Sequence, residues 1–418
     1  SSIIAWQPVI AGRSVFVVRQ TGFPPESTAS PVVAMSLDDG RELWHADLPA
    51  NPNDWTAWIA GVSLGASGVR QVYASRSGNG ASISAKLYAI DAATGAMRWP
   101  TGSQDLIDAG PYDGVVFADN GDPVIASFRT IKRIRASDGT TMWSVARVAS
   151  VSGNCGGAIR GNAIYIADTV AGGQAIKKFN LTTGAFMYQS TVMAGFLIQN
   201  TPMVSPDGTI YLSRVQNNQN VDFFFAINDS GSAMTIRWFK PAGYSTSSEF
   251  AVANDNSVYM WAPGNFLQRR SAADGTLLNQ TAATIPADFA APRLAVDSAG
   301  RVFFSNGAFG NGRFYSFNED LTQRWSLPVP NINIGAPAIG ADGTLVIAGV
   351  GTNIFALRTT REPPCIGDFN QDGGVDGQDV EAFFHVWEAG SDTGDVNQDG
   401  GVDGQDVAFF FLRWEAGC

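Results

Sequence analysis

The chain has 418 residues, of which 45% are hydrophobic and 16% are charged, and its formal net charge is −11. This composition excludes a disordered chain, and no run of eighteen apolar residues predicts a membrane span. Nearly all of the net charge lies in residues 362–418, which hold thirteen acidic residues and one arginine, so residues 1–361 are close to neutral. Because neither segment has a clustered basic face, we do not expect a nucleic-acid partner.

The chain begins at Ser1 without a signal segment, which favours a processed protein whose targeting segment has been removed. One sequence unit then recurs: an alternating apolar strand, a turn, and a second strand that usually ends in an aromatic residue. Such a pair predicts a β-hairpin. The seven copies end at Trp44, Trp99, Trp143, Tyr188, Trp238, Asn279 and Trp325, 41 to 55 residues apart. The glycines expected to supply the positive φ of the turns are Gly40, Gly95, Gly139, Gly184 and Gly275.

The period of this unit is typical of the four-stranded blades of a β-propeller. A second strand pair precedes the hairpins, as in the segments after Pro202 and Pro337. An eighth copy begins at Ile334 and ends near Thr360 without an outer strand, and the orphan segment at residues 3–8 has the pattern of an outer strand. The sequence therefore predicts an all-β propeller of eight four-stranded blades, closed by the N-terminal strand.

The line AIDAATGAMRW, residues 89–99, resembles the PQQ-type propeller repeat. That repeat is shared by quinoprotein dehydrogenases and by a non-enzymatic propeller lipoprotein of outer-membrane assembly. The resemblance covers about residues 1–360 and implies the fold without implying one activity. We expect the recurring tryptophans to be wedged between neighbouring blades rather than to stack on a ligand.

Residues 367–390 and 394–417 repeat one another at a spacing of 27 residues, and each copy opens with D-x-N-x-D-G-x-x-D-x-x-D. A loop of this kind offers Ca²⁺ side-chain oxygens from positions 1, 3, 5, 9 and 12 and a carbonyl from position 7. The candidate ligands are Asp368, Asn370, Asp372, Gly374, Asp376 and Asp379, then Asp395, Asn397, Asp399, Gly401, Asp403 and Asp406. Because the carboxylates of an empty loop repel one another, we expect two structural calcium ions.

An amphipathic helix is predicted after each loop from apolar residues at i, i+3, i+4 and i+7. The two stripes are Val380, Phe383, Phe384 and Trp387, and Val407, Phe410, Phe411 and Trp414, and we expect them to face each other. The second helix carries Phe409 and Leu412 where the first has Ala382 and His385. This extra apolar pair is either a face against the propeller or the contact for a partner.

Two of the three cysteines, Cys365 and Cys418, bracket the acidic segment, which suggests a disulfide and an oxidising compartment. Cys155 is left over, and we interpret it as a small buried thiol.

A duplicated loop and helix without the leading helix of an EF-hand resembles the type I dockerin. The Cys-bounded form ending in Gly-Cys resembles a dockerin-like anchoring domain of certain bacteria, covering residues 365–418. The resemblance implies that loop positions 10 and 11 take part in partner choice. These positions are Gly377, Gln378, Gly404 and Gln405, which depart from the commonest hydroxyl pair, so a cellulosomal cohesin is not the expected partner. We expect Gln378, Gln405, Phe409 and Leu412 to be the partner contacts.

Two domains follow, a propeller at residues 1–361 and a dockerin-like module at residues 362–418. We predict a secreted, extracellular or cell-surface, non-catalytic scaffold whose module binds a protein or a cell-surface component. One alternative is a subunit that polymerises head-to-tail through the module into a filament. Another is a quinoprotein-dehydrogenase-like enzyme. The compact blades, the absence of adjacent cysteines and the presence of only two histidines, His45 and His385, argue against catalysis, so no catalytic residue and no PQQ are expected.

Overall fold

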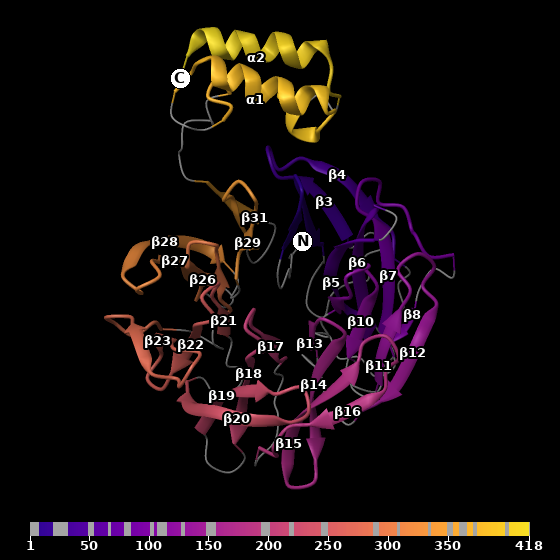
Figure 1. Cartoon of the computed structure of the whole chain (residues 1–418), viewed down its shortest axis with the longest axis vertical. Coiled ribbons are helices and arrows are strands. Elements are labelled where there is room, and N and C mark those ends of the chain that lie inside the picture. Colours follow the sequence, from indigo (N-terminus) through magenta and orange to yellow (C-terminus); the bar gives the residue numbers. More distant parts are fainter. Residues whose placement is uncertain are drawn as a thin grey trace. The chain divides into compact units, whose positions relative to one another are not determined.

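The computed structural model describes residues 8–19, 32–48, 54–65, 68–78, 85–100, 104–106, 115–126, 130–147, 156–193, 201–216, 221–243, 250–286, 292–306, 310–332, 336–348, 354–358, 366–370, 374–397 and 401–417. The chain divides into two compact units, Ser1–Leu357 and Arg358–Cys418. The first unit contains all of the described strands, and the second contains the described helices (Figure 1).

The first unit is an eight-bladed β-propeller, as the repeat predicts. Seven of its sheets have four described strands and one has three, and each sheet is built from strands consecutive in the chain and paired antiparallel. The first four sheets are β1 (Val9–Ala11), β2 (Ser14–Val18), β3 (Val32–Ser36) and β4 (Glu42–Ala46); β5 (Asp54–Leu64), β6 (Arg70–Gly78), β7 (Ala85–Asp91) and β8 (Gln104–Leu106); β9 (Val115–Phe117), β10 (Pro123–Ala126), β11 (Thr130–Ile134) and β12 (Thr141–Ala146); and β13 (Gly157–Arg160), β14 (Ala163–Val170), β15 (Gly173–Asn180) and β16 (Phe186–Gln189).

The other four sheets continue the same order around the ring. They are β17 (Met203–Val204), β18 (Ile210–Gln216), β19 (Val221–Asp229) and β20 (Met234–Ala242); β21 (Phe250–Val252), β22 (Val258–Ala262), β23 (Phe266–Arg270) and β24 (Leu277–Gln280); β25 (Ala295–Val296), β26 (Val302–Ser305), β27 (Gly310–Phe317) and β28 (Gln323–Ile332); and β29 (Ala338–Ile339), β30 (Leu345–Ala348) and β31 (Ile354–Leu357).

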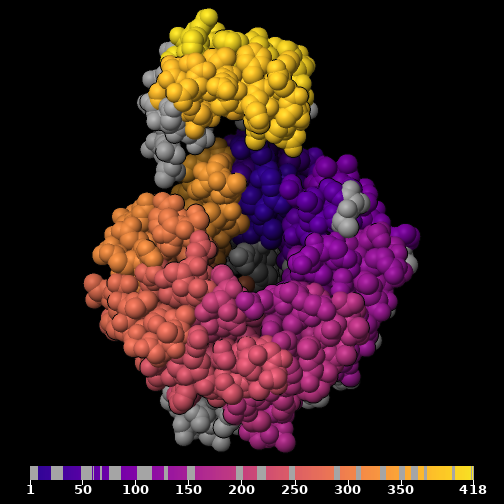
Figure 2. Space-filling view, viewed as in Figure 1, coloured from indigo at the N-terminus to yellow at the C-terminus, as the bar shows by residue number. Residues whose placement is uncertain are grey.

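The first strands of neighbouring blades line the centre of the ring. Contacts join β1 to β5, β5 to β9, β9 to β13, β13 to β17 and β21 to β25, and β1 also contacts β29 of the last blade. The first and last blades are therefore neighbours, and Figure 2 shows the centre of this unit as a hollow. The outer strand predicted for the last blade falls mostly on residues 3–7, which lie outside the described residues, so closure by that strand stays a prediction.

The second blade differs from the expected pattern at its outer edge. The sequence predicts an outer strand that ends at Trp99, but the structure has only an isolated bridge between Ile90 and Met97, and β8 begins at Gln104. Pro100 follows the tryptophan directly and has no N–H to donate to a strand ladder. The hairpin prediction is correct for the turn and wrong for the position of the outer strand.

Neighbouring blades are joined by one repeated contact. A tryptophan that follows the turn of one blade packs on the turn glycine of the next blade and donates its indole N–H to a carbonyl oxygen of the same turn. The donor and acceptor pairs are Trp44 with Ala92 at 3.0 Å, Trp99 with Ala136 at 3.0 Å, Trp143 with Leu181 at 3.0 Å and Trp238 with Ala272 at 2.9 Å. The expectation that these rings are wedged between blades is confirmed.

The turn glycines are required by two constraints at once. All five predicted turn glycines have φ between 70° and 76°, a region that costs an L-residue about 1–2 kcal/mol. In addition, a Cβ on Gly139 would lie 2.7 Å from the ring of Trp99, and Gly95, Gly184 and Gly275 have equally close rings. Gly40 has the same φ of 74° but no atom within 4 Å of its Cβ position.

Polar groups join the blades where the tryptophan is missing. Tyr188 lies in β16 of the fourth blade, and its hydroxyl donates to Asp229 of the fifth blade at 2.7 Å, while Lys178 Nζ donates to the same carboxylate at 2.8 Å. Burial acts to raise the pKa of Asp229, but the hydrogen bonds from Lys178 and Tyr188 outweigh it and lower the pKa to about 2. In the sixth blade Asn279 of β24 stands in the tryptophan position, and Tyr259 of that blade donates to Gly300 O of the seventh blade at 3.0 Å.

We predict that Gly139→Ala destabilises the propeller more than Gly40→Ala does. Both substitutions impose the cost of a positive φ, about 1–2 kcal/mol. Only the first also forces Cβ against the indole of Trp99, which should add about 1–3 kcal/mol of overpacking. Urea unfolding of the two variants and the parent protein, followed by tryptophan fluorescence, measures the difference. Equal losses in the two variants would mean that the indole contact does not constrain the turn.

Candidate functional site

The second unit contains two helices, and each of them begins with an aspartate N-cap. Helix α1 is Gly377–Glu388, α2 is Gly404–Ala416, and a short 3₁₀ helix, η1 (Asp392–Gly394), lies between them. Asp376 is the N-cap of α1, and its side chain accepts a hydrogen bond from Gln378 N at 2.8 Å. Asp403 is the N-cap of α2 in the same way. The N-terminus of each helix also has a capping box. The two predicted helices are confirmed.

Each loop is held against its helix by one buried carboxylate. Both oxygens of Asp379 accept backbone N–H groups, from Asn370 at 3.0 Å and from Asp376 at 2.8 Å. Asp406 repeats these bonds with Asn397 at 3.1 Å and with Asp403 at 2.8 Å. Asp379 and Asp406 are fully buried. Loop positions 3, 9 and 12 are therefore drawn together in both copies.

The predicted metal ligands form two matched sets of oxygen donors. The structure describes Asp368, Asn370, Gly374, Asp376 and Asp379 of the first loop, and Asp395, Asn397, Gly401, Asp403 and Asp406 of the second. The position-5 residues, Asp372 and Asp399, lie outside the described residues. Among the residues that are described, no group of three or more His, Cys, Asp or Glu side chains is arranged to hold a metal. The donor set, which consists of hard oxygens only, fits Ca²⁺.

The two helices pack through a core of aromatic rings. Phe383 of α1 and Phe410 of α2 are fully buried and stack with their centroids 4.2 Å apart at an angle of 9°. Phe369, from the first loop, meets both rings edge-on, at 5.6 Å and 6.0 Å. The prediction that the two stripes face each other is confirmed.

A reciprocal pair of hydrogen bonds links each helix to the loop of the other repeat. Trp387 Nε1 of α1 donates to Asp403 O at 2.8 Å, and Trp414 Nε1 of α2 donates to Asp376 O at 2.9 Å. Gly367, the first residue of the first repeat, packs closely against Trp414. A Cβ atom at Gly367 would lie 3.0 Å from the Cα atom of Trp414. The sequence duplication is thus a structural two-fold relation.

The predicted partner contacts differ in their exposure. Gln378 and Gln405 are exposed at the first turns of the helices, and Leu412 is 65% exposed. Phe409 is half-buried, with the guanidinium carbon of Arg413 lying 5.1 Å from its ring centroid. Of these four residues, Leu412 is the one that offers a large apolar surface to a partner.

The three cysteines, Cys155, Cys365 and Cys418, lie outside the described residues. The disulfide and the free thiol therefore stay predictions.

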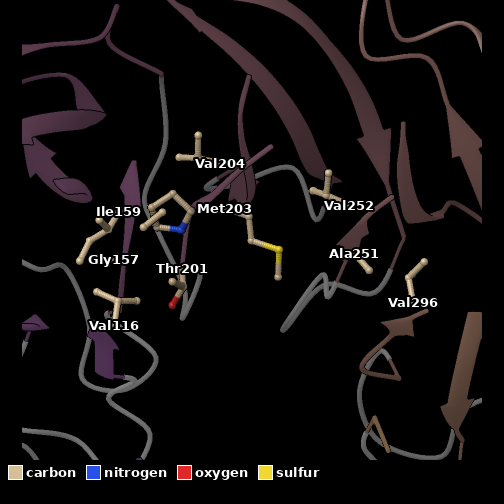
Figure 3. Close-up of a pocket in the computed structure, with 11 residues that line it drawn as sticks. Val116, Gly157, Ile159, Thr201, Met203, Val204, Ala251, Val252 and Val296 are labelled. Carbon is tan, nitrogen blue, oxygen red and sulfur yellow. The ribbon is translucent and has the colours of Figure 1, made fainter. Parts of the chain in front are cut away.

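A cavity of about 460 Å³ lies among the inner strands of five blades, from β9 to β25 (Figure 3). The described residues that line it are apolar apart from Thr201, and Met203 extends into the space between the strands. The lining residues are Val116, Gly157, Ala158, Ile159, Thr201, Pro202, Met203, Val204, Ala251, Val252 and Val296. None of these described residues has a side chain that is charged or that titrates near neutral pH. Sequence reasoning missed this cavity because the short apolar strands that form it are far apart in the chain.

Among the described residues, no helix has the length and apolar character needed to cross a membrane.

Comparisons with known proteins agree with the propeller. A family model described as outer membrane protein assembly factor BamB matches residues 28–278. BamB from Moraxella catarrhalis is 14% identical with a TM-score of 0.54, covering 84% of this chain and 96% of that one. The computationally designed Ika8 protein is 11% identical with a TM-score of 0.57, covering 86% and 96%. Quinohemoprotein alcohol dehydrogenase from Comamonas testosteroni is 13% identical with a TM-score of 0.51, covering 84% and 72%. Comparison with curated proteins gives no match.

We predict that Phe410→Ala unfolds the helical unit in saturating calcium while Phe409→Ala does not. Truncation of a fully buried Phe costs about 3–5 kcal/mol, which is comparable to the whole stability of a unit of this size. Phe409 lies next to it in the chain but outside the ring stack. Limited proteolysis of the full chain should degrade the tail of the first variant and leave its propeller intact. Equal resistance of both variants would contradict the assigned core.

Proposed function

The chain belongs to the family of the outer membrane protein assembly factor BamB, and we propose that it is a secreted, non-catalytic scaffold connected to its partner through a calcium-stabilised, dockerin-like module. Its propeller fold is of a type that serves protein interaction. The observation that carries the proposal is the duplicated helix pair. Hydrogen bonds join each helix to the loop of the other repeat, and the apolar side chain of Leu412 is exposed.

The lining of the central cavity supports a non-catalytic role. A quinoprotein-like enzyme needs a base and a polar site for its cofactor, whereas the described residues that line the cavity are apolar apart from Thr201. The likeness to quinohemoprotein alcohol dehydrogenase, at 13% identity, concerns the fold alone. We propose that the propeller holds no PQQ and that no residue is catalytic.

Two calcium ions are proposed, one in each loop, with Asp368, Asn370, Asp372, Gly374, Asp376 and Asp379 as the first set of ligands and Asp395, Asn397, Asp399, Gly401, Asp403 and Asp406 as the second. Calcium supplies positive charge that offsets the repulsion between the carboxylates of a loop. The capping bonds of Asp379 and Asp406 support this assignment, because they already hold positions 3, 9 and 12 together.

The proposed location is extracellular or at the cell surface. A disulfide between Cys365 and Cys418 would close the ends of the module and requires an oxidising compartment. In the chain-entropy model a loop of this length gains roughly 4 kcal/mol from such a bond. Calcium at extracellular concentrations would keep the loops filled.

The proposed partner contacts are Gln378, Gln405, Phe409 and Leu412, and the proposed partner is a protein or a cell-surface component. A second candidate is self-assembly. If the module bound the propeller of an identical neighbour, the contact would be heterologous and would produce an open filament unless a ring closed. Exposed Leu412 is favourable to both arrangements.

We predict that chelator-treated full-length protein binds two calcium ions, with dissociation constants on the order of 10⁻⁴ to 10⁻⁷ M. The double variant Asp368→Ala with Asp395→Ala should bind none, because both loops lose their first ligand. Asp392→Ala, which removes an exposed carboxylate outside the loops, is the control and should bind two ions. Isothermal titration calorimetry measures the stoichiometry. A stoichiometry of zero in the parent protein would reject the metal assignment.

We predict that Leu412→Asp and Phe409→Asp abolish anchoring or assembly, and that chelation does the same. His385→Asp places the same charge at the equivalent exposed position of α1 and should have no effect. Sedimentation with the cell envelope reports anchoring, and electron microscopy of the purified protein reports filaments, each with and without chelator. Retention of the contact in a chain that ends at Arg361 would locate the interface on the blades.

A further inference from the structure

Each proposed calcium loop is held by its own helix and also by the helix of the other repeat. The carbonyl of Asp376, in the first loop, accepts the indole N–H of Trp414 from α2 at 2.9 Å. The carbonyl of Asp403, in the second loop, accepts that of Trp387 from α1 at 2.8 Å. Both acceptors are at loop position 9, and both residues are also helix N-caps.

We propose that the two loops bind calcium cooperatively and crosswise, with Trp414 as the positioning residue for the first loop and Trp387 as the positioning residue for the second. This inference rests on the proposed calcium binding and adds the coupling between the two sites. Neither tryptophan is a ligand, and each acts through the backbone of a ligand-bearing residue.

The path of the coupling follows from the contacts around Asp376. Its amide donates to the buried carboxylate of Asp379, its side chain caps α1, and its carbonyl holds Trp414 of α2. An ion in the first loop that orders Asp376 therefore also orders the indole of Trp414. That indole lies on the last turns of α2, whose Phe410 is stacked on Phe383.

The same path operates in the opposite direction through Asp403, Asp406 and Trp387. Because coupling between two binding sites is reciprocal, each ion should raise the affinity of the other site by the same factor. In the absence of ions, repulsion among the loop carboxylates opposes these contacts, so the first ion provides most of the ordering.

The hydrogen bonds of Trp387 and Trp414 run between the two repeats, and this distinguishes the proposal from one in which each repeat supports only its own loop. If each loop were supported only by its own repeat, Trp387 would matter for the first loop and Trp414 for the second. The hydrogen bonds predict the reverse assignment. Single-loop proteins make the assignment measurable: Asp395→Ala leaves only the first site, and Asp368→Ala leaves only the second.

The experiment titrates calcium into the chelator-treated full chain by calorimetry. In the Asp395→Ala background, Trp414→Phe should weaken the remaining site about three- to tenfold, the effect of one lost hydrogen bond, and Trp387→Phe should change it less than twofold. In the Asp368→Ala background the two variants exchange roles. Since both variants remove the same indole N–H and the same ring volume, each is the matched control of the other.

A second measurement does not depend on the tryptophan variants folding. In the Asp395→Ala protein labelled with ¹⁵N-tryptophan, calcium should shift the indole N–H resonance of Trp414 more than that of Trp387, and in the Asp368→Ala protein the order should reverse. The unmodified chain should bind its two ions with positive cooperativity. Independent binding of two ions, or larger effects within a repeat than across repeats, would overturn the coupling and leave the proposed function intact. Absence of calcium binding in the unmodified chain would overturn both.

Discussion

The contact between an indole ring and a turn glycine is the interaction on which the propeller depends. A blade is a four-stranded sheet with two faces to cover, and its neighbours must approach at a repeated angle. The tryptophan at the outer strand supplies a large apolar ring, and the glycine supplies the space for it. The indole N–H then satisfies a turn carbonyl, as in Trp143 with Leu181, so the joint buries no unpaired donor. This joint recurs at four interfaces between neighbouring blades.

Polar side chains join neighbouring blades where no tryptophan indole is present. Between the fourth and fifth blades, Tyr188, Lys178 and Asp229 form a partly buried polar cluster in place of the indole contact. The cluster compensates by hydrogen bonding, which explains the low pKa of Asp229. At the centre of the ring, the described residues that line the cavity between β9 and β25 are apolar apart from Thr201. The blades are thus joined by indole contacts at some interfaces and by polar clusters at others.

The helical unit repeats this principle on a smaller scale. Again a tryptophan from one repeat lies against a glycine and a backbone carbonyl of the next, as in Trp414 with Gly367 and Asp376. Here there are only two repeats, so the contact is reciprocal rather than cyclic. Two short loops that are rich in carboxylates could not hold such a shape by themselves. The stacked Phe383 and Phe410, the crossed indoles and the proposed ions supply the missing stabilisation together.

The sequence alone was sufficient for the features that local chemistry specifies. The spacing of Trp44, Trp99 and Trp143 predicted the blades, the turn glycines predicted the positive φ values, and the i, i+3, i+4 pattern predicted both helices and their facing stripes. Each of these follows from steric limits on a few neighbouring residues. Tertiary structure decided what depends on residues distant in the chain: the partner of each indole, the displacement of β8 beyond Pro100, the aliphatic cavity between β9 and β25, and the crossing of Trp387 and Trp414 between the two loops. A period in the sequence shows that units repeat, but it does not contain the angle and register at which they pack, and these determine which atoms meet.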